Sequence, residues 1–290
     1  MKRKNPVAVI AHIVFILLTV CFIAPLIFVI LISISNEMDI YKYGYSIIPK
    51  HIDFTAYKIV FYDLSQMLKA FGISLLSAIG GSTLVVLLCA SIGYSLSVRT
   101  FKYRKVIMTY VLITMLFGGG LIPTYIVNTQ LLGLADNLLV HLVLGLVGAW
   151  NIILFRTFFS QIPGSVIESA VVDGATQGKV FTSIIIPMSK PIISTVFFTS
   201  ALGRWNDWQT SLYYIRNKDL YSIQYLMQKV LTEAEFIRQT YLEQQGGIEL
   251  LPVETMRYAM CVVGCLPIFI LFPYMQKSFS KGLAVGSVKG

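Results

Sequence analysis

The stretch Ser165–Pro187, SVIESAVVDGATQGKVFTSIIIP, is a polar interruption between two long apolar runs, and the rest of the chain is organised around it. Ser165 stands three residues before Glu168, which is the spacing of a capping box at a helix start. Asp173 and Gly174 then offer a stop, because glycine accepts the left-handed conformation that commonly follows a helix end. We therefore expect a helix, a turn and a second short helix. The final proline either ends that second helix or begins the next element.

The first of these helices carries a short apolar strip. Val166, Ile167, Ala170 and Val171 recur at the i, i+3, i+4 spacing of one helix face. The strip is too long for a tether and too small to form a core of its own. It is predicted to pack against a partner.

Apolar residues dominate the rest of the chain, which predicts a membrane protein. Of the 290 residues, 56% are hydrophobic and only 13% are charged, and the mean hydropathy is +0.73. A helix of about 20 apolar residues crosses the hydrocarbon core of a bilayer. Six such helices are predicted within one all-α transmembrane domain, 1–290, at about 7–34, 71–96, 106–127, 138–159, 192–215 and 258–275.

The distribution of charge sets the predicted orientation. With six spans, both termini lie on one side, together with the loop 160–191 and the tail 276–290. That side holds 13 basic and 2 acidic residues, whereas the other side, which includes the loop 216–254, holds 10 and 12. Basic loops stay in the cytoplasm, so both termini are predicted to be cytoplasmic. The positions of the basic residues are explained by membrane topology and by contact with lipid headgroups. Nucleic-acid binding is therefore not predicted.

The spacing within the polar stretch resembles a known signature. Glu168-Ser169-Ala170 is followed by three residues, Gly174, nine residues and Ile184-Ile185-Ile186-Pro187. This is similar to the cytoplasmic signature of ABC-importer permeases, E-A-A, three residues, G, nine residues, I-x-L-P, with Ser169 and Ile186 as small departures. In that family the loop is a coupling helix that sits in a cleft of an ATPase subunit. The resemblance implies coupling roles for Glu168, Ser169, Ala170, Asp173, Gly174, Ile184 and Pro187.

Two further strings extend the resemblance. The tail 276–290, QKSFSKGLAVGSVKG, closely resembles that of maltose-type sugar permeases, in which the tail reaches between the ATPase subunits. FGGGLIPTY, at 117–125, resembles a carbohydrate-permease subgroup linked to complex oligosaccharides. A role at the ATPase interface is therefore implied for Gly282, Leu283, Gly286, Lys289 and Gly290.

The resemblance implies the type I permease fold in a bacterial cytoplasmic membrane. The chain would pair with a second permease subunit, as a heterodimer, and with two ATPase subunits and an extracytoplasmic sugar-binding protein. Its cargo would be an oligosaccharide or polysaccharide fragment. ATP and magnesium would be bound by the ATPase partners, so the chain is expected to be no enzyme and to hold no cofactor. Its own Gly174–Val180 departs from a phosphate loop, since it has three residues between glycines where four are required and lacks the following Ser or Thr.

Two interruptions within apolar runs are candidates for the substrate pathway. Three consecutive glycines weaken the third span, and broken helices often line a pathway, so Gly119, Gly120 and Pro123 are candidates, with tight packing or a kink as the alternative. In the fifth span, Trp205, Asn206, Asp207 and Trp208 are expected to face a water-filled cavity and contact sugar. The alternative is that Arg204 pairs with Asp207, three residues on.

Three predictions remain open at this stage. The helical period of 216–254 predicts an amphipathic helix, which either receives the binding protein or lies over the cavity mouth. The four cysteines fall in apolar spans and are expected to be packing residues, so no metal site is predicted. An ion-coupled secondary sugar transporter is the alternative function, but Asp207 is the one acidic residue within the predicted spans.

Overall fold

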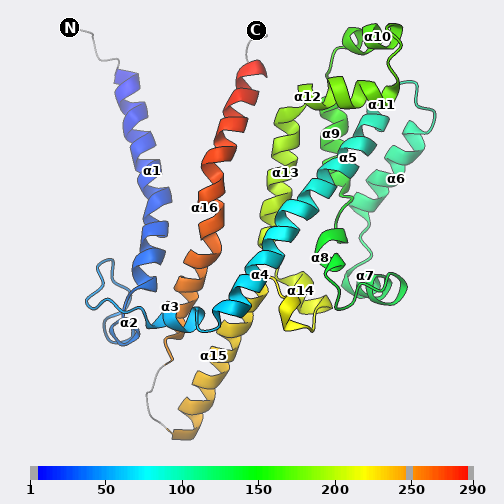
Figure 1. Cartoon of the computed structure of the whole chain (residues 1–290). Coiled ribbons are helices and arrows are strands. Elements are labelled where there is room, and N and C mark those ends of the chain that lie inside the picture. Colours follow the sequence, from blue (N-terminus) through cyan, green and yellow to red (C-terminus); the bar gives the residue numbers. More distant parts are fainter. Residues whose placement is uncertain (1–5, 246–250, 287–290) are drawn as a thin grey trace. The chain divides into compact units, whose positions relative to one another are not determined.

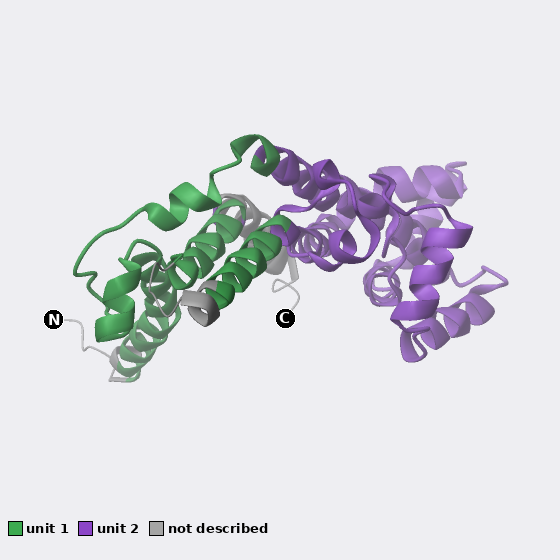
Figure 2. Ribbon diagram, turned by 90° about the horizontal axis from the view of Figure 1, so that it is seen from below, with its two compact units in different colours: residues 1–67, 226–267 green, residues 68–225, 268–290 purple. Residues whose placement is uncertain are grey.

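The computed structural model describes residues 6–245 and 251–286, and the regular structure there is helical, apart from one isolated β-bridge between Ser35 and Ile52. The predicted all-α class is confirmed. The chain divides into two compact units, 1–67 with 226–267 and 68–225 with 268–290 (Figure 2). The single domain expected from the sequence stays a prediction.

The first unit is built mainly from three long helices and two short ones. These are α1 (Pro6–Ser33), α2 (Glu37–Tyr43), α3 (Thr55–Val60), most of α15 (Ile223–Gln245) and the first part of α16 (Val253–Gly286). The buried carboxylate of Glu37 in α2 accepts hydrogen bonds from the amides of Glu254 and Thr255, at 3.0 and 2.9 Å. An acid from a distant helix therefore satisfies the free amides at the start of α16.

The second unit carries the signature stretch (Figure 1). A continuous helix runs through α4 (Leu64–Leu76), a π-helical turn (Ser77–Gly81) and α5 (Ser82–Ser97). Then follow α6 (Arg104–Leu116), α7 (Leu121–Ile126), a π-helical turn (Val127–Leu131), α8 (Leu139–Val143), α9 (Ala149–Phe159), α10 (Gly164–Val172), α11 (Gln177–Val180), a π-helical turn (Phe181–Ile185), α12 (Ile186–Met188), α13 (Lys190–Trp205), α14 (Gln209–Tyr214) and a 3₁₀ turn (Lys218–Leu220).

Within the described residues, two helices are long and apolar enough to cross a membrane, Ile10–Ser33 and Leu64–Ser97. Two bent pairs also qualify if each pair is one span, which makes up to four. Residues 104–116 and 121–131 are bent by 116°, and residues 177–188 and 190–205 by 80°. The prediction of six spans with cytoplasmic termini stays a prediction.

Three of the predicted spans are interrupted. The break in 106–127 falls at the glycines that indicated one, whereas the breaks in 138–159 and 192–215 correct the continuous helices expected there. The breaks fall at 117–120, 144–148 and 206–208. Gly120 and Gly145 have positive φ, at 80° and 67°, which an α-helix does not accommodate. Apolar composition continues across the break at 144–148, so hydropathy alone does not reveal it, whereas the break at 206–208 contains the polar residues Asn206 and Asp207.

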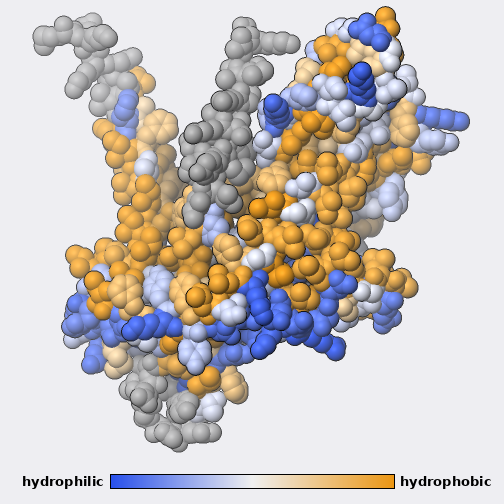
Figure 3. Space-filling view, viewed as in Figure 1, coloured by the Kyte–Doolittle hydropathy of each residue, from blue (hydrophilic) through white to orange (hydrophobic). Residues whose placement is uncertain are grey.

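The core of the second unit lies between α5 and α9. Cys89, Phe155 and Phe159 are buried there, with Val180 and Ile185 from the signature stretch. Gly93 permits the close approach, because a Cβ at this position would lie 2.7 Å from Phe155 Cβ and 3.0 Å from the Arg156 amide nitrogen. Figure 3 shows a broad apolar surface over this unit, interrupted by hydrophilic residues near α10.

Candidate functional site

The signature stretch begins with α10, whose start differs from the prediction. The helix begins at Gly164, with Pro163 as the N-cap and no side-chain hydrogen bond to the free amides. The predicted capping box of Ser165 and Glu168 is therefore wrong. Pro163 itself precedes the first helical turn with its φ angle fixed by the ring, and the helix starts two residues earlier than the capping box predicted.

The turn after α10 follows the prediction. Gly174 has φ +80°, its amide donates to Val171 O at 3.0 Å, and the Ala175 amide donates to Ala170 O at 2.9 Å. This pair of bonds is a Schellman motif, which satisfies the last carbonyls of the helix. The predicted stop at Asp173 and Gly174 is confirmed.

The second helix of the stretch starts at a side-chain cap. Thr176 Oγ1 accepts from the Lys179 amide, and α11, a π-helical turn and α12 continue to Met188. Pro187 lies in the last turn of this helical run, one residue before its end at Met188, which agrees with a proline that ends the second helix. The chain then bends at Ser189 and enters α13.

Aromatic rings attach the stretch to α5 and α9. Tyr94 of α5 stacks on Phe181 with ring centroids 5.0 Å apart, and its hydroxyl donates to Gln177 Oε1 at 2.8 Å. Phe159 of α9 contacts both rings edge-on. Val180 and Ile185 are completely buried. The stretch is thus packed onto α5 and α9 as part of the same core.

The opposite face of the stretch is open. Glu168, Ser169, Asp173, Gly174 and Pro187 are exposed, while Ala170 and Ile184 are half-buried. Val172 exposes 86% of its surface, whereas Ile167 and Ala170 pack against the core. The apolar strip of α10 therefore finds part of its partner within this chain. A cavity of about 730 Å³ lies beside Glu168, between α10 and the turn after α5.

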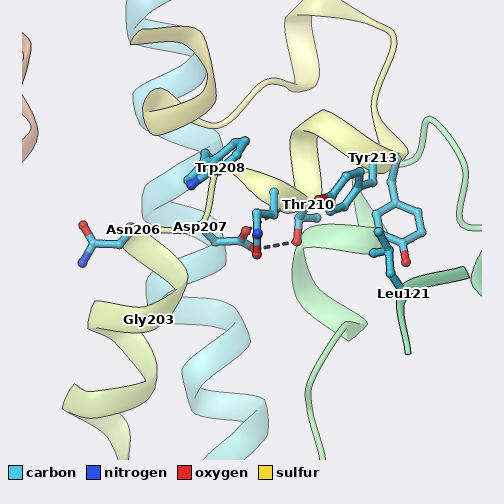
Figure 4. A pocket seen from close by; sticks show the side chains of 9 residues that line it. Leu121, Gly203, Asn206, Asp207, Trp208, Thr210 and Tyr213 are labelled. Carbon is cyan, nitrogen blue, oxygen red and sulfur yellow. Dashed lines mark hydrogen bonds between the residues drawn. The ribbon is translucent and has the colours of Figure 1, made fainter. Parts of the chain in front are cut away.

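A second cavity, of about 460 Å³, lies where two helix breaks meet (Figure 4). Its lining comes from the last turn of α13, from the break between α13 and α14, from α14 itself, and from the first residue after the glycine break: Leu121, Gly203, Asn206, Asp207, Trp208, Gln209, Thr210, Tyr213 and Tyr214. An adjoining cavity of about 240 Å³ shares Gly203, Asp207 and Thr210 and adds polar groups of His141, Asn151 and Arg204. Aromatic, hydroxyl and carboxylate groups thus gather at one place.

The candidate residues of the fifth span do not all line this cavity. Asp207 and Trp208 line it, and Trp208 is 39% exposed. Asn206 lies at its edge, but its amide points away from Asp207 and donates to Leu202 O (Figure 4). Trp205 is buried, with its ring edge-on to Phe71 at 5.4 Å, and is not among the lining residues.

The third-span candidates border the break without lining the cavity. Gly119, Gly120 and Pro123 are exposed, and Leu121 is the lining residue from this segment. The far side of the break is fixed to α14, because Tyr125 packs on Tyr214 at 5.5 Å and Asn128 donates to the Tyr214 hydroxyl at 3.2 Å. The glycine break therefore positions a short helix at the cavity wall.

Arg204 is satisfied by backbone carbonyls rather than by the acid three residues on. Its guanidinium donates to His141 O at 2.7 Å and to Leu144 O at 2.8 Å, at the end of α8. A Cβ on Gly81 would lie 2.6 Å from Arg204 Nη1, so the guanidinium lies directly against that glycine. Asp207 instead accepts from the Thr210 amide and hydroxyl. The alternative of an Arg204–Asp207 pair is wrong.

Several lining residues were missed from the sequence, although one signal was available. An acid three residues before Thr210 is a helix-start pattern, and the structure uses it to begin α14. Tyr213 and Tyr214 follow within that short helix, but hydropathy had assigned them to a continuous span.

Beyond α14, the carboxylate of Asp136 accepts from the Asn217 and Arg216 amides, and these hydrogen bonds hold its pKa below the ordinary value.

The remaining candidates are in the tail. Helix α16 extends to Gly286, so the helix expected to end near 275 continues through Gly282 and Leu283. Lys289 and Gly290 lie outside the described residues. No group of three or more potential metal-ligating side chains occurs within the residues that the structure describes. The predicted amphipathic helix of 216–254 is present as α15.

The sequence of this chain is similar to those of known transport proteins. Residues 88–285 match the family described as binding-protein-dependent transport system inner membrane component. Protein LplC of Bacillus subtilis (strain 168) is 32% identical over 92% of this chain and 90% of its own length. The polygalacturonan/rhamnogalacturonan transport system permease protein YtcP of the same organism is 31% identical over 92% of this chain and 93% of its own length.

A solved structure gives the same result for the fold. One chain of a bacterial ABC transporter involved in the import of the acidic polysaccharide alginate superposes with a TM-score of 0.79 and 25% identity. The match covers 96% of this chain and all of that one. The signature stretch, the broken helices and these matches together identify the chain as a member of the binding-protein-dependent transport system inner membrane components, with the fold of ABC-importer permeases.

Proposed function

We propose that this chain is one permease subunit of an ATP-driven importer for oligosaccharides or polysaccharide fragments. The observation that carries the proposal is the exposed signature stretch, which is packed on its inner face against α5 and α9 and open on the face that bears Glu168. The relatives named for polygalacturonan, rhamnogalacturonan and alginate import support a carbohydrate cargo.

In the proposed mechanism, the stretch Glu168–Pro187 acts as a rigid lever. When two ATPase subunits close on ATP, the docked α10 moves with them, and the packing of Phe181 on Tyr94 transmits the movement to α5. Close-packed interiors transmit displacement because they have little free volume. The spanning helices then alternate between inward-open and outward-open states. ATP and magnesium belong to the ATPase partners.

The sugar pathway is proposed to pass the cavity at the helix breaks. Trp208 and Tyr213 offer aromatic faces, and Asp207 with Thr210 offers polar groups to hydroxyls. We expect Trp208→Ala to lower uptake at subsaturating sugar by about fivefold, the equivalent of one aromatic contact. Trp150→Ala is the matched control, because Trp150 is 61% exposed and lies outside the cavity lining. Equal uptake by the two variants would remove the cavity from the pathway.

The partners follow from the same proposal. A second permease subunit would complete the pathway as a heterodimer, an extracytoplasmic binding protein would deliver the sugar, and the tail from Gly282 would reach the ATPase interface. The proposed location is the bacterial cytoplasmic membrane, with both termini in the cytoplasm.

The test is uptake of labelled oligosaccharide by membrane vesicles that contain the assembled complex, with the energy source varied. We expect uptake to require ATP and the binding protein, and to persist when ionophores collapse ion gradients. An ion-coupled secondary transporter gives the reverse result, with uptake abolished by the ionophore and indifferent to ATP. The full-length chain purified in mild detergent should also bring an ATPase and a second permease with it.

A further inference from the structure

A fourth cavity, of about 720 Å³, lies between the turn after α5, the start of α6 and the end of α9. Five of its nine lining residues are cations and none is acidic. The cations are Arg99, Lys102, Arg104, Lys105 and Arg156. Figure 3 shows hydrophilic residues projecting at the turn that precedes α6. Such a concentration of positive charge around one hollow requires compensation by an anion or by solvent.

Arg156 distinguishes this cavity from an ordinary basic turn. It comes from α9, more than fifty positions after the other four cations, and its side chain reaches the same hollow. Its Nε is buried and has no hydrogen-bond partner among the described residues. A buried donor without a partner is costly, so an acceptor at this position would stabilise the protein.

The surroundings of the cavity favour an amphiphilic anion over a soluble one. Met108 and Thr109 line the end of the cavity farther along α6. On the same helix, Val106 is 70% exposed and Tyr110 is 67% exposed. The cationic hollow therefore continues into an exposed apolar helix surface, on which hydrocarbon chains can lie. A free phosphate would use the cations but not this surface.

Two simpler explanations leave part of the arrangement unexplained. The charge rule for membrane topology accounts for cations in a short turn, but not for the buried Arg156 Nε. The position of Arg156 in the last turn of α9 suits the helix dipole, yet this leaves the same donor unpaired. Coverage by an ATPase subunit is a third possibility, since Arg99 and Thr100 also line the cavity beside Glu168.

We propose that this cavity binds the phosphate headgroup of an anionic phospholipid. Arg156 donates to the phosphodiester, the four cations of the turn neutralise its charge, and the acyl chains lie along α6 beside Val106 and Tyr110. The site would hold the α5–α6 turn and α9 together next to the signature stretch. This proposal does not depend on what the transporter carries.

The test measures lipid binding by the purified full-length chain in a neutral detergent. Short-chain phosphatidylglycerol is titrated against short-chain phosphatidylcholine and against glycerol 3-phosphate. We expect phosphatidylglycerol to bind most tightly and Arg156→Gln to weaken its binding about fivefold, as expected for the loss of one cation near a phosphate. Lys190→Gln is the control, because it removes an exposed cation that is not among the lining residues.

Each other outcome overturns the proposal. Equal affinity for the two lipids, or equal weakening by Arg156→Gln and Lys190→Gln, would mean that the cavity has no headgroup site. Glycerol 3-phosphate binding as tightly as phosphatidylglycerol would identify a soluble-anion site instead. Loss of bound phosphatidylglycerol when the ATPase subunit is added would show that the ATPase covers the cavity. If Arg156→Gln does not fold, Lys105→Gln replaces it with the same expected direction.

Discussion

The two ends of the second unit are held together by different forces. At the end that carries the signature stretch, the contacts are aromatic and aliphatic: Tyr94, Phe159 and Phe181 pack ring to ring over the buried Val180 and Ile185. At the cavity end, helices stop and restart, and hydrogen bonds together with the Tyr125–Tyr214 ring contact hold the pieces. From this difference we infer that the end with the signature stretch moves as a rigid body and that the cavity end contains the hinges.

Three of the hydrogen-bonded groups at the cavity end lie where helices stop or restart. Arg204 holds the end of α8, Asp207 starts α14, and Asn128 fastens the short helical segment after the glycine break to α14. The bonds of Arg204 and Asn128 join separate helical pieces and the bond of Asp207 begins one, so each marks a place where two arrangements could differ. Hinges generally sit at element ends, where a few residues absorb the change in backbone angles.

The largest expected effect comes from breaking the cavity end at Arg204. Arg204→Met leaves the His141 and Leu144 carbonyls without their charged donor, and we expect the free energy of unfolding to fall by about 3 kcal/mol. Arg204→Lys keeps the charge but does not reproduce the two-point fork, so its loss should be smaller. Unfolding of the detergent-solubilised chain measures both. A Met variant as stable as the native chain would contradict this role.

A packing change at the other end should have the next largest effect. Gly93→Ala forces α5 away from α9, and we expect a loss of about 2 kcal/mol in the free energy of unfolding. Gly72→Ala is the matched control, because Gly72 is exposed in α4 and an alanine Cβ there would meet nothing within 4 Å. Replacing a helical glycine by alanine should stabilise that site by about 1 kcal/mol. If both variants changed the free energy of unfolding in the same direction, the close approach of α5 and α9 at Gly93 would be contradicted.

A smaller effect is expected where a hydrogen bond accompanies ring packing. Tyr94→Phe retains the stack on Phe181 and removes only the bond to Gln177, which should cost about 1 kcal/mol. Hydrogen exchange over residues 177–185 should rise modestly. Tyr110→Phe, at an exposed ring on α6, should leave this exchange unchanged. Complete loss of protection in Tyr94→Phe would mean that the bond, and not the rings, holds the stretch.

Much of this arrangement could be predicted from the sequence, because local signals carried it. Gly174 marked the end of α10, the long-range spacing from Glu168 to Pro187 marked the family, and the glycines at 118–120 marked a break. These features depend on backbone angles or on fixed spacing, and both are properties of neighbouring residues. The apolar runs likewise predicted a helical membrane protein.

The rest depended on contacts between distant residues. Nothing near Arg204 indicates that it binds carbonyls of α8, about sixty positions earlier, and nothing near Glu37 indicates that it caps α16. Ser74 likewise supplies an acceptor for the Ile223 amide at the start of α15. The break at 144–148 escaped hydropathy, because a helix can stop without any loss of apolar character, and the polar residues at 206–208 were expected to lie within a continuous helix. Trp205 and Trp208, three positions apart, consequently have different surroundings.

The docking role of α10 is tested most sharply by co-purification of the ATPase subunit with the full-length chain carrying Glu168→Lys. Glu233→Lys is the charge-matched control, since Glu233 has a side chain 62% exposed on α15, outside the signature stretch. We predict that both variants fold and insert into the membrane, that the control retains the ATPase at the native ratio, and that Glu168→Lys loses it. Equal recovery of the ATPase with both variants would contradict the assignment of α10 as its docking helix.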